Sequence, residues 1–383
     1  MTTNGVTMKK IQILAASILL MSAALSFSGA NAEEKSNGGE NKGNSSNQSQ
    51  EFKGSGTRSH GHPLYNLSDA PTAGSVQDKS SFVKNDDEAS ELEWQKWNKV
   101  NSKATAKALN SLASNPIIYH AGGSLNVYSG SVQIIPVWVG NWDANRKATW
   151  NTILGTLVSS LGSNSIAMPK HIFNTNLGYF SNNAPTLSWP NSLSATIPAT
   201  GSIKSGLIQV SDANVATYIN SAISKNVISK GVKPIYVYIG ASNTRLSSGF
   251  GTAYCGWHSL GSIGNASVPY IAVQDIPDLY SRGCAAQTIS PNGDYKLDAV
   301  ASILVHEIDE SLTDPDLATW YDARGAENAD KCAWAFGTSY ILNGAKWNYQ
   351  APGTSTKYYI QMNWLADNKV TDPVTGSACV VTK

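Results

Sequence analysis

The sequence predicts an α/β (α+β) fold with a mixed central sheet and flanking helices. Three short apolar runs, rich in β-branched residues and bounded by Gly, Pro or Asp, have the character of strands: residues 132–139, 235–239 and 268–273. Helical patterns lie between these runs, and the mixture is typical of this fold class. The chain from residue 116 onward is long enough for one large domain or two tightly joined ones.

Two helices and one further strand can be bounded from the pattern. The first helix follows Asp143, a good N-cap residue, and ends before Gly162. Its apolar face consists of Trp150, Ile153, Leu157 and Leu161. The second helix opens at Asp212 and runs through residue 223, and a last strand is expected at residues 358–364.

Residues 1–32 have the features of a secretory signal peptide. Lys9 and Lys10 precede an apolar run at residues 11–27, and small residues lead to Ala32, after which we expect cleavage. The run is too short for a comfortable membrane span, and no later stretch contains about 18 uninterrupted apolar residues. We therefore expect a secreted, extracellular protein with no membrane span, the periplasm and the cell wall being alternative locations.

Two further segments precede the globular domain, which we place at residues 116–383. Residues 33–85 predict a low-complexity, disordered linker, because so polar a segment buries too little surface to offset the entropy cost of ordering. Residues 86–115 carry apolar side chains at helical spacing and predict an amphipathic helix. This helix either packs on the main domain or is a removable pro-segment.

The charge composition argues against nucleic-acid binding. Charged residues make up 14% of the chain, against roughly 25% in typical soluble domains. The 28 Lys and Arg residues are matched by 27 Asp and Glu residues. No basic surplus is left to neutralise phosphate groups.

The four cysteines predict two disulfides. An even number of cysteines in an exported protein favours pairing, and of the three possible pairings we expect Cys255 with Cys284 and Cys332 with Cys379. No CxxC motif is present, which leaves little support for a cysteine-based zinc site or a thioredoxin-like redox site.

The candidate functional residues lie on a helix that we expect from Asp298 to Asp314. Asp298 can cap the start of this helix. Pro315 prevents its continuation. The stripe that we expect to be buried consists of Val300, Leu304, Ile308 and Leu312.

Three residues of this helix predict a metal site. His306 and Glu310 lie four residues apart and stack on the same face, with Glu307 next to His306. This is the HExxH zinc-helix pattern with a carboxylate in place of the second imidazole. An imidazole and a carboxylate can hold a divalent ion while Glu307 acts as general base toward the metal-bound water. The competing interpretation is a core helix with a hydrogen-bonded histidine.

A third ligand must come from elsewhere in the chain. In gluzincin metallopeptidases it is an acid about twenty residues downstream of the zinc helix. Here Glu327 and Asp330 lie three residues apart, and either one can be the ligand while the other orients a histidine ring. Zinc is the ion that we expect, and an oxygen-richer site would also suit calcium or manganese.

Further histidines and tryptophans of the sequence have side chains suited to the same site or to a different function. His258 can reach the metal site, but a lone histidine beside a disulfide is more often structural. The same holds for His120, which follows Tyr119. Tryptophan rings can stack on sugars, although two of them lie in predicted strands and are expected in the core. The rings considered are Trp138, Trp142, Trp257, Trp320, Trp334 and Trp364.

Taken together, these motifs resemble the exordium, or phosphate-induced protein 1, family of secreted plant proteins and their microbial relatives. The resemblance covers residues 118–380 in the same order. It rests on Tyr119-His120-Ala-Gly-Gly, Val137-Trp138-Val-Gly-Asn-Trp142, Tyr254-Cys255-Gly256-Trp257-His258, Pro291-Asn292-Gly-Asp, His306-Glu307-Ile-Asp-Glu310-Ser-Leu-Thr-Asp314-Pro315, Trp320-Tyr321, Glu327-Asn-Ala-Asp330-Lys-Cys332 and Gln361-Met-Asn-Trp364.

The resemblance implies an extracellular or cell-wall-associated protein, since the plant members are linked to cell expansion, but it supplies no reaction. This sequence departs from the plant pattern at Asp314, where those members usually carry Asn, and around Cys284, where a second nearby cysteine is not evident. The low-complexity linker also lies outside the family pattern.

Two functions from different classes follow. The leading hypothesis is a metal-dependent hydrolase that acts on peptide or related amide bonds. The alternative is a non-catalytic extracellular module that binds cell-wall polysaccharide or takes part in signalling. The expected partner is accordingly a peptide or protein substrate, or a cell-wall polysaccharide.

Overall fold

The computed structural model describes the globular part of the chain and one short upstream strand. The described residues are 61–63, 116–121, 124–161, 177–181, 185–190, 196–247, 249–251, 254–281, 283–322, 325–369, 371 and 378–381. The predicted signal peptide, most of the predicted linker and the predicted helix at residues 86–115 lie outside the described residues.

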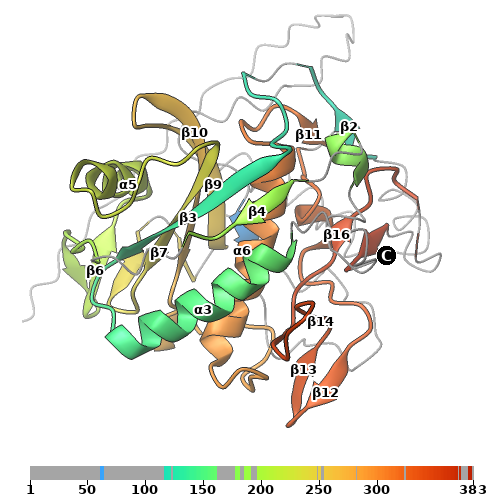
Figure 1. The fold of residues 1–383 in the computed structure, drawn as a ribbon. Helices are drawn as coiled ribbons and strands as arrows, with labels where there is room; N and C mark the ends of the chain where they lie inside the picture. Colours follow the sequence, from blue (N-terminus) through green and yellow to red (C-terminus); the bar gives the residue numbers. More distant parts are fainter. Residues whose placement is uncertain are drawn as a thin grey trace, which may run out of the picture. The chain divides into compact units, whose positions relative to one another are not determined.

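A six-stranded mixed sheet organises the domain (Figure 1). From one edge to the other its strands are β1 (Gly61–Pro63), β9 (Tyr254–Ile263), β10 (Ala266–Gln274), β7 (Pro234–Gly240), β3 (Ser131–Val139) and β4 (Thr186–Ser188). The four strands from β10 to β4 are parallel, whereas β9 runs antiparallel to β10, and β1 antiparallel to β9. The predicted fold class and the three predicted strands are confirmed.

The α-helices among the described residues cover both faces of this sheet. α3 (Ala144–Leu161) and α6 (Tyr295–Thr313) lie side by side, and α5 (Val215–Ser224) packs on β3, β7 and β9 (Figure 1). A Cβ added at Gly256 of β9 would meet Ile303 of α6, whereas one added at Gly261 would meet Ala216 of α5. Because side chains alternate along a strand, α5 and α6 lie on opposite faces.

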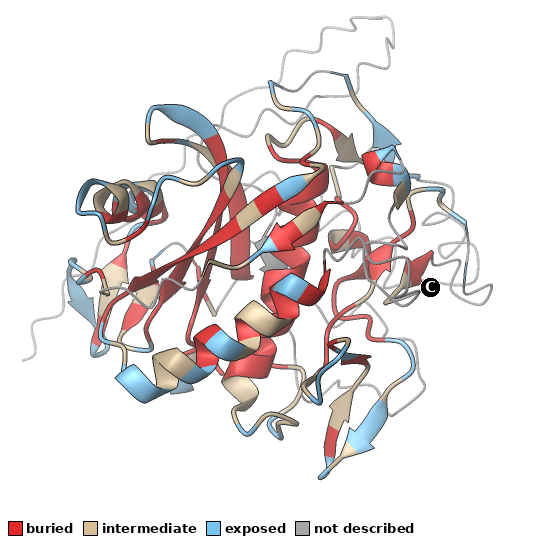
Figure 2. Cartoon of the chain, in the orientation of Figure 1, coloured by how far each residue is buried: buried red, intermediate tan, exposed pale blue. Residues whose placement is uncertain are grey.

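α6 is buried along its length rather than on one stripe. The residues from Leu297 to Thr313 are all buried (Figure 2), including the four that form the predicted stripe. The helix also begins earlier than predicted, because Asp294 is the N-cap and accepts hydrogen bonds from the backbone N–H groups of Lys296 and Leu297. Asp298 instead accepts hydrogen bonds from the side chains of Ser290 and Asn292.

The strand predicted at residues 358–364 is wrong as one element. It divides into β15 (Lys357–Tyr358), which pairs with β14 (Tyr349–Gln350), and β16 (Asn363–Trp364), which pairs with β17 (Cys379–Val380). Between β15 and β16 the backbone forms hydrogen bonds with side chains and not with a neighbouring strand. The Asn348 side chain binds both the N–H and the C=O of Ile360, and the Ser302 hydroxyl of α6 accepts from the N–H of Gln361. These contacts draw the segment toward α6.

The remaining short elements surround the sheet. β2 (Ile118–Tyr119) pairs with β11 (Trp320–Tyr321), β12 (Tyr340–Leu342) pairs with β13 (Ala345–Trp347), and β5 (Ile203–Lys204), β6 (Leu207–Val210) and β8 (Thr244–Leu246) form a small sheet. The 3-10 helices are η3 (Leu177–Phe180), η4 (Asp212–Asn214), η5 (Asp278–Tyr280) and η6 (Asp330–Cys332). No helix in the described part of the chain is long and apolar enough to cross a bilayer.

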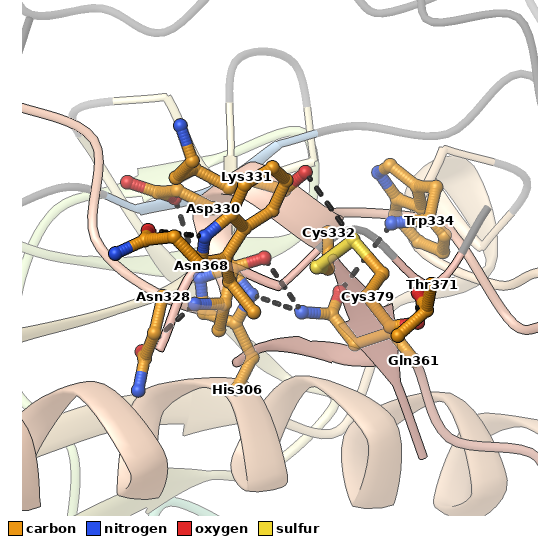
Figure 3. Close-up of a disulfide and its surroundings, with 12 residues drawn as sticks. His306, Asn328, Asp330, Lys331, Cys332, Trp334, Gln361, Asn368, Thr371 and Cys379 are labelled. Atoms are coloured by element: carbon orange, nitrogen blue, oxygen red, sulfur yellow. Dashed lines mark hydrogen bonds and ion pairs between the residues drawn. A yellow bond between two sulfur atoms is a disulfide. The ribbon is translucent and has the colours of Figure 1, made fainter. Parts of the chain in front are cut away.

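Both predicted disulfides are confirmed. Cys255 pairs with Cys284 and joins the start of β9 to the loop that leads into α6. Cys332 pairs with Cys379 and joins η6 to β17 (Figure 3). Each disulfide therefore anchors a segment next to α6.

Three residues of the predicted linker are ordered as β1. Residues 33–85 contain too few apolar side chains to form a hydrophobic core. Gly61–Pro63 does not depend on such a core, because it pairs with the backbone of β9. This is a long-range contact that local composition does not encode.

The buried carboxyl group of Asp298 predicts a pH-dependent loss of stability. Burial raises the pKa of Asp298 to about 6 in the native state. As the pH rises from 4 to 6, this carboxyl group therefore ionises in the unfolded chain before it ionises in the native state, and the free energy of unfolding falls. A rise of about two pKa units corresponds to roughly 3 kcal/mol. Asp298→Asn should escape this loss, so its stability relative to the wild type should increase by about 1–3 kcal/mol between pH 4 and pH 7.

Urea unfolding of the oxidised protein at pH 4, 5, 6 and 7 measures this difference. Asp367→Asn, which removes an exposed carboxylate, is the matched control and should show no such trend. Parallel stability curves for Asp298→Asn and the wild type would contradict the prediction.

Candidate functional site

The site is built where α6 faces β9. His306, Glu307 and Glu310 occupy successive positions on one side of the helix, and each has 0% of its surface exposed. Gly256 of β9 permits this close packing, because a Cβ there would lie 2.5 Å from Ile303 Cγ2 and 3.3 Å from Glu307 Oε1. The two elements therefore meet at the level of Glu307.

His258 brings a second imidazole into the site from β9. Its Nδ1 lies 3.3 Å from Glu307 Oε2 and 3.4 Å from Glu310 Oε2, and its Nε2 lies 3.5 Å from Glu327 Oε1. The sequence favours a structural role for this residue, whereas the structure places it among the acids. Its position two residues after Gly256, on the α6-facing side of the strand, is a signal that only the sheet topology makes readable.

His306 is held from the opposite side by Gln361. The Gln361 amide has a fixed orientation, because its Nε2 donates to the Ala329 carbonyl and its Oε1 accepts from the Trp334 N–H. Its Nε2 therefore donates to His306 Nδ1 at 2.7 Å (Figure 3). The imidazole proton then resides on Nε2, which faces Glu310 Oε2 at 3.2 Å and Asp330 Oδ1 at 3.5 Å.

The two predicted third ligands reach the site from the segment before η6. Glu327 is buried, and among the described residues neither of its carboxylate oxygens has a hydrogen-bond partner. The Asp330 N–H donates to Glu310 Oε1 at 3.0 Å, and Asp330 Oδ2 accepts from the Glu327 N–H. A buried carboxylate without a donor is costly unless it is protonated or faces a cation.

The ionisable groups of this cluster shift one another's pKa values. Burial alone would lower the pKa of His258, but Glu307 and Glu310 outweigh it and raise the pKa to about 9. Burial and the nearby charge of Glu310 raise the pKa of Glu327 well above its ordinary value. The pKa of Glu310 is lowered despite burial, because both histidines face it. A positive charge among these buried acids would therefore be stabilised.

Two groups of these residues have ligand atoms within 4.8 Å of one another: His258, Glu310 and Glu327, and His306, Glu310 and Asp330. Glu310 belongs to both groups. All the predicted site residues therefore lie together, and His258 is the member that the sequence did not select.

Buried polar contacts fix the segment that carries Glu327 and Asp330. Asn328 donates to Asp309 of α6 at 2.9 Å. Lys331 pairs with buried Asp322 at 3.0 Å and lies over the Trp364 ring at 4.4 Å. With the Cys332–Cys379 disulfide, these contacts hold the acids against the helix.

The other sequence candidates lie outside this cluster. His120 stacks on Tyr321 with ring centroids 3.7 Å apart and an interplanar angle of 2°. Trp142 and Trp320 are half-buried. The tryptophans that lie in the core and present no free ring face are Trp138, Trp257, Trp334 and Trp364.

Comparison with known proteins identifies the family. The family model described as the phosphate-induced protein 1 conserved region matches residues 117–346. The chain belongs to this family. It is also 25% identical over 293 residues to Protein EXORDIUM-like 3 from Arabidopsis thaliana, a match that covers 64% of this chain and 79% of that protein. No solved structure matches this exordium-like chain.

The close approach of β9 to α6 predicts that Gly256→Ala is destabilising. The added methyl would have to displace Ile303 or move the strand, and overpacking of this kind typically costs about 1–3 kcal/mol. Urea unfolding measures the loss. Ser262→Ala, at an exposed position of the same strand, should stay within about 0.5 kcal/mol of the wild type. Equal stability of Gly256→Ala and the wild type would disprove the close packing.

Proposed function

We propose that this exordium-like protein is an extracellular, metal-dependent hydrolase that acts on peptide or related amide bonds and uses a divalent ion, zinc, in the α6–β9 cluster. The observation that carries the proposal is buried Glu327, whose two carboxylate oxygens lack hydrogen-bond donors in the described structure. Its Oε1 faces His258 Nε2 at 3.5 Å. A cation between these groups would satisfy both of them.

The donor atoms suit zinc better than calcium. Two imidazoles and several carboxylates form a mixed nitrogen and oxygen set, which zinc accepts, whereas calcium takes oxygen ligands. Manganese also fits such a set. We assign His258, Glu310 and Glu327 as ligands, because Gln361 holds His306 in the form whose Nε2 carries a proton. His306 and Asp330 then border the ion.

Glu307 is the proposed general base. It lies beside His258 without belonging to either group of candidate ligands. Burial raises the pKa of its carboxyl group, which strengthens it as a proton acceptor near neutral pH. The ion, when bound, supplies a Lewis acid that polarises an amide carbonyl and makes water a nucleophile at neutral pH. Glu307 would take the proton from the attacking water and pass it to the leaving amine.

The extracellular part of the proposal rests on three supports. The sequence carries the features of a signal peptide, the family resemblance is to secreted proteins, and both cysteine pairs form disulfides, which persist in oxidising compartments.

Metal analysis tests the ligand set. The wild-type protein, purified after zinc loading and dialysis, should hold about one zinc ion per chain by elemental mass spectrometry. Glu310→Gln, Glu327→Gln and His258→Ala should each bind zinc at least tenfold more weakly, because each removes a ligand atom. Asp298→Asn is the matched control, since it alters a buried carboxylate of the same helix outside the cluster and should keep its zinc. A wild type without metal, together with a fully stable Glu310→Ala variant, would refute the site.

Hydrolysis of a peptide library tests the base. Glu307→Gln keeps the shape of the side chain but cannot accept a proton, so turnover should fall about 10²–10⁴-fold while zinc content stays the same. If zinc is bound and Glu307→Gln leaves turnover unchanged, the ion has a structural role and the hydrolase proposal is wrong.

A further inference from the structure

The edge of the sheet beside the site is occupied by the chain's own upstream residues. In the β1–β9 ladder, Gly61 pairs with Trp257, His62 with Gly256 and Pro63 with Tyr254. The β9–β10 ladder begins only at Trp257, which pairs with Ala272. β1 therefore pairs with the edge of β9 that faces away from β10.

This edge runs directly along the proposed catalytic groups. Gly256, the partner of His62, lies against Ile303 and Glu307 of α6, and His258 follows two residues later on the same face. β1 itself also lies against α6. A polypeptide in the position of β1 would thus pass beside Glu307 and the imidazole of His258.

We propose that residues 254–257 of β9 bind an extended polypeptide substrate by antiparallel strand pairing, and that residues 61–63 occupy this edge as a built-in competitor. The inference rests on the proposed function, since it names the binding mode of the peptide substrate. Strand addition uses backbone hydrogen bonds, so it accepts substrates of varied sequence. A competitor in the same chain loses no translational entropy on pairing and therefore excludes a dilute peptide.

The described geometry agrees with such competition. His258, Glu307 and Glu310 are fully buried, and β1 occupies the backbone edge of β9 that a substrate strand would use, so the two strands exclude each other. Pro63 suits the end of a replaceable strand, because proline has no N–H to donate to a ladder. The Cys255–Cys284 disulfide anchors the β9 edge to the chain before α6, so the edge can stay in place when its partner leaves.

Amide hydrogen exchange of the full-length protein tests the pairing. Replacing Gly61 and His62 together by proline removes two backbone donors from β1. Protection of those amides of residues 255–257 that face β1 should then fall at least tenfold, while the amides of β7 and β10 keep theirs and show that the domain is folded. The same double change at Gly54 and Ser55 is the matched control and should leave the β9 edge protected.

A synthetic peptide shows whether the edge accepts a strand in trans. A peptide with the sequence of residues 58–66, added at millimolar concentration to the double-proline variant, should restore the protection. The same peptide N-methylated at the positions of Gly61 and His62 should not. Unchanged protection in the variant, or no recovery with the peptide, would overturn the proposal.

Turnover separates this proposal from the hydrolase itself. The double-proline variant should hydrolyse a peptide library at least tenfold faster than the wild type, and the 58–66 peptide should inhibit it. The exchange measurements require neither metal nor activity, so they decide the strand site even if Glu307→Gln shows that no hydrolysis occurs. Restored protection combined with uninhibited turnover would overturn the role of this edge in substrate binding.

Discussion

The structure depends on how the buried carboxylates of Glu310 and Glu327 are neutralised. Both lie in the core, where an uncompensated negative charge costs several kcal/mol. Two imidazoles, from β9 and from α6, face Glu310 within 3.4 Å. Protonation of the His258 ring can balance part of this negative charge, and a divalent ion would do so with more charge. The same electrostatic need thus explains both the raised pKa of His258 and the proposed metal site.

The elements around α6 serve to hold this cluster in one geometry. Gly256 lets β9 approach the helix, and Gln361 fixes the ring of His306. On the far side, the Asn328–Asp309 contact and the Cys332–Cys379 disulfide hold the segment that carries Glu327. A helix buried on all sides has no solvent to stabilise its polar residues, so each of them needs a partner from a neighbouring element.

The same packing that protects the cluster limits access to it. The proposed hydrolysis would need a substrate within reach of Glu307, and Glu307 is fully enclosed. The β9 edge offers a route, because strand pairing is a contact that can be exchanged between chains without rebuilding the core. In this proposal, Gly61–Pro63 and a substrate strand compete for the same backbone edge of β9.

The sequence by itself determined the strands at residues 132–139, 235–239 and 268–273, and it predicted two disulfides and a cluster of acids made of Glu310 with Asp330 or Glu327, because periodicity, cysteine count and motif spacing are local signals. Only the tertiary structure decided that His258 joins them, that Asp294 rather than Asp298 caps α6, and that part of the polar upstream segment forms β1. Each of these depends on which strand lies beside which helix, and such long-range contacts arise from burial and backbone pairing across the fold rather than from neighbouring residues.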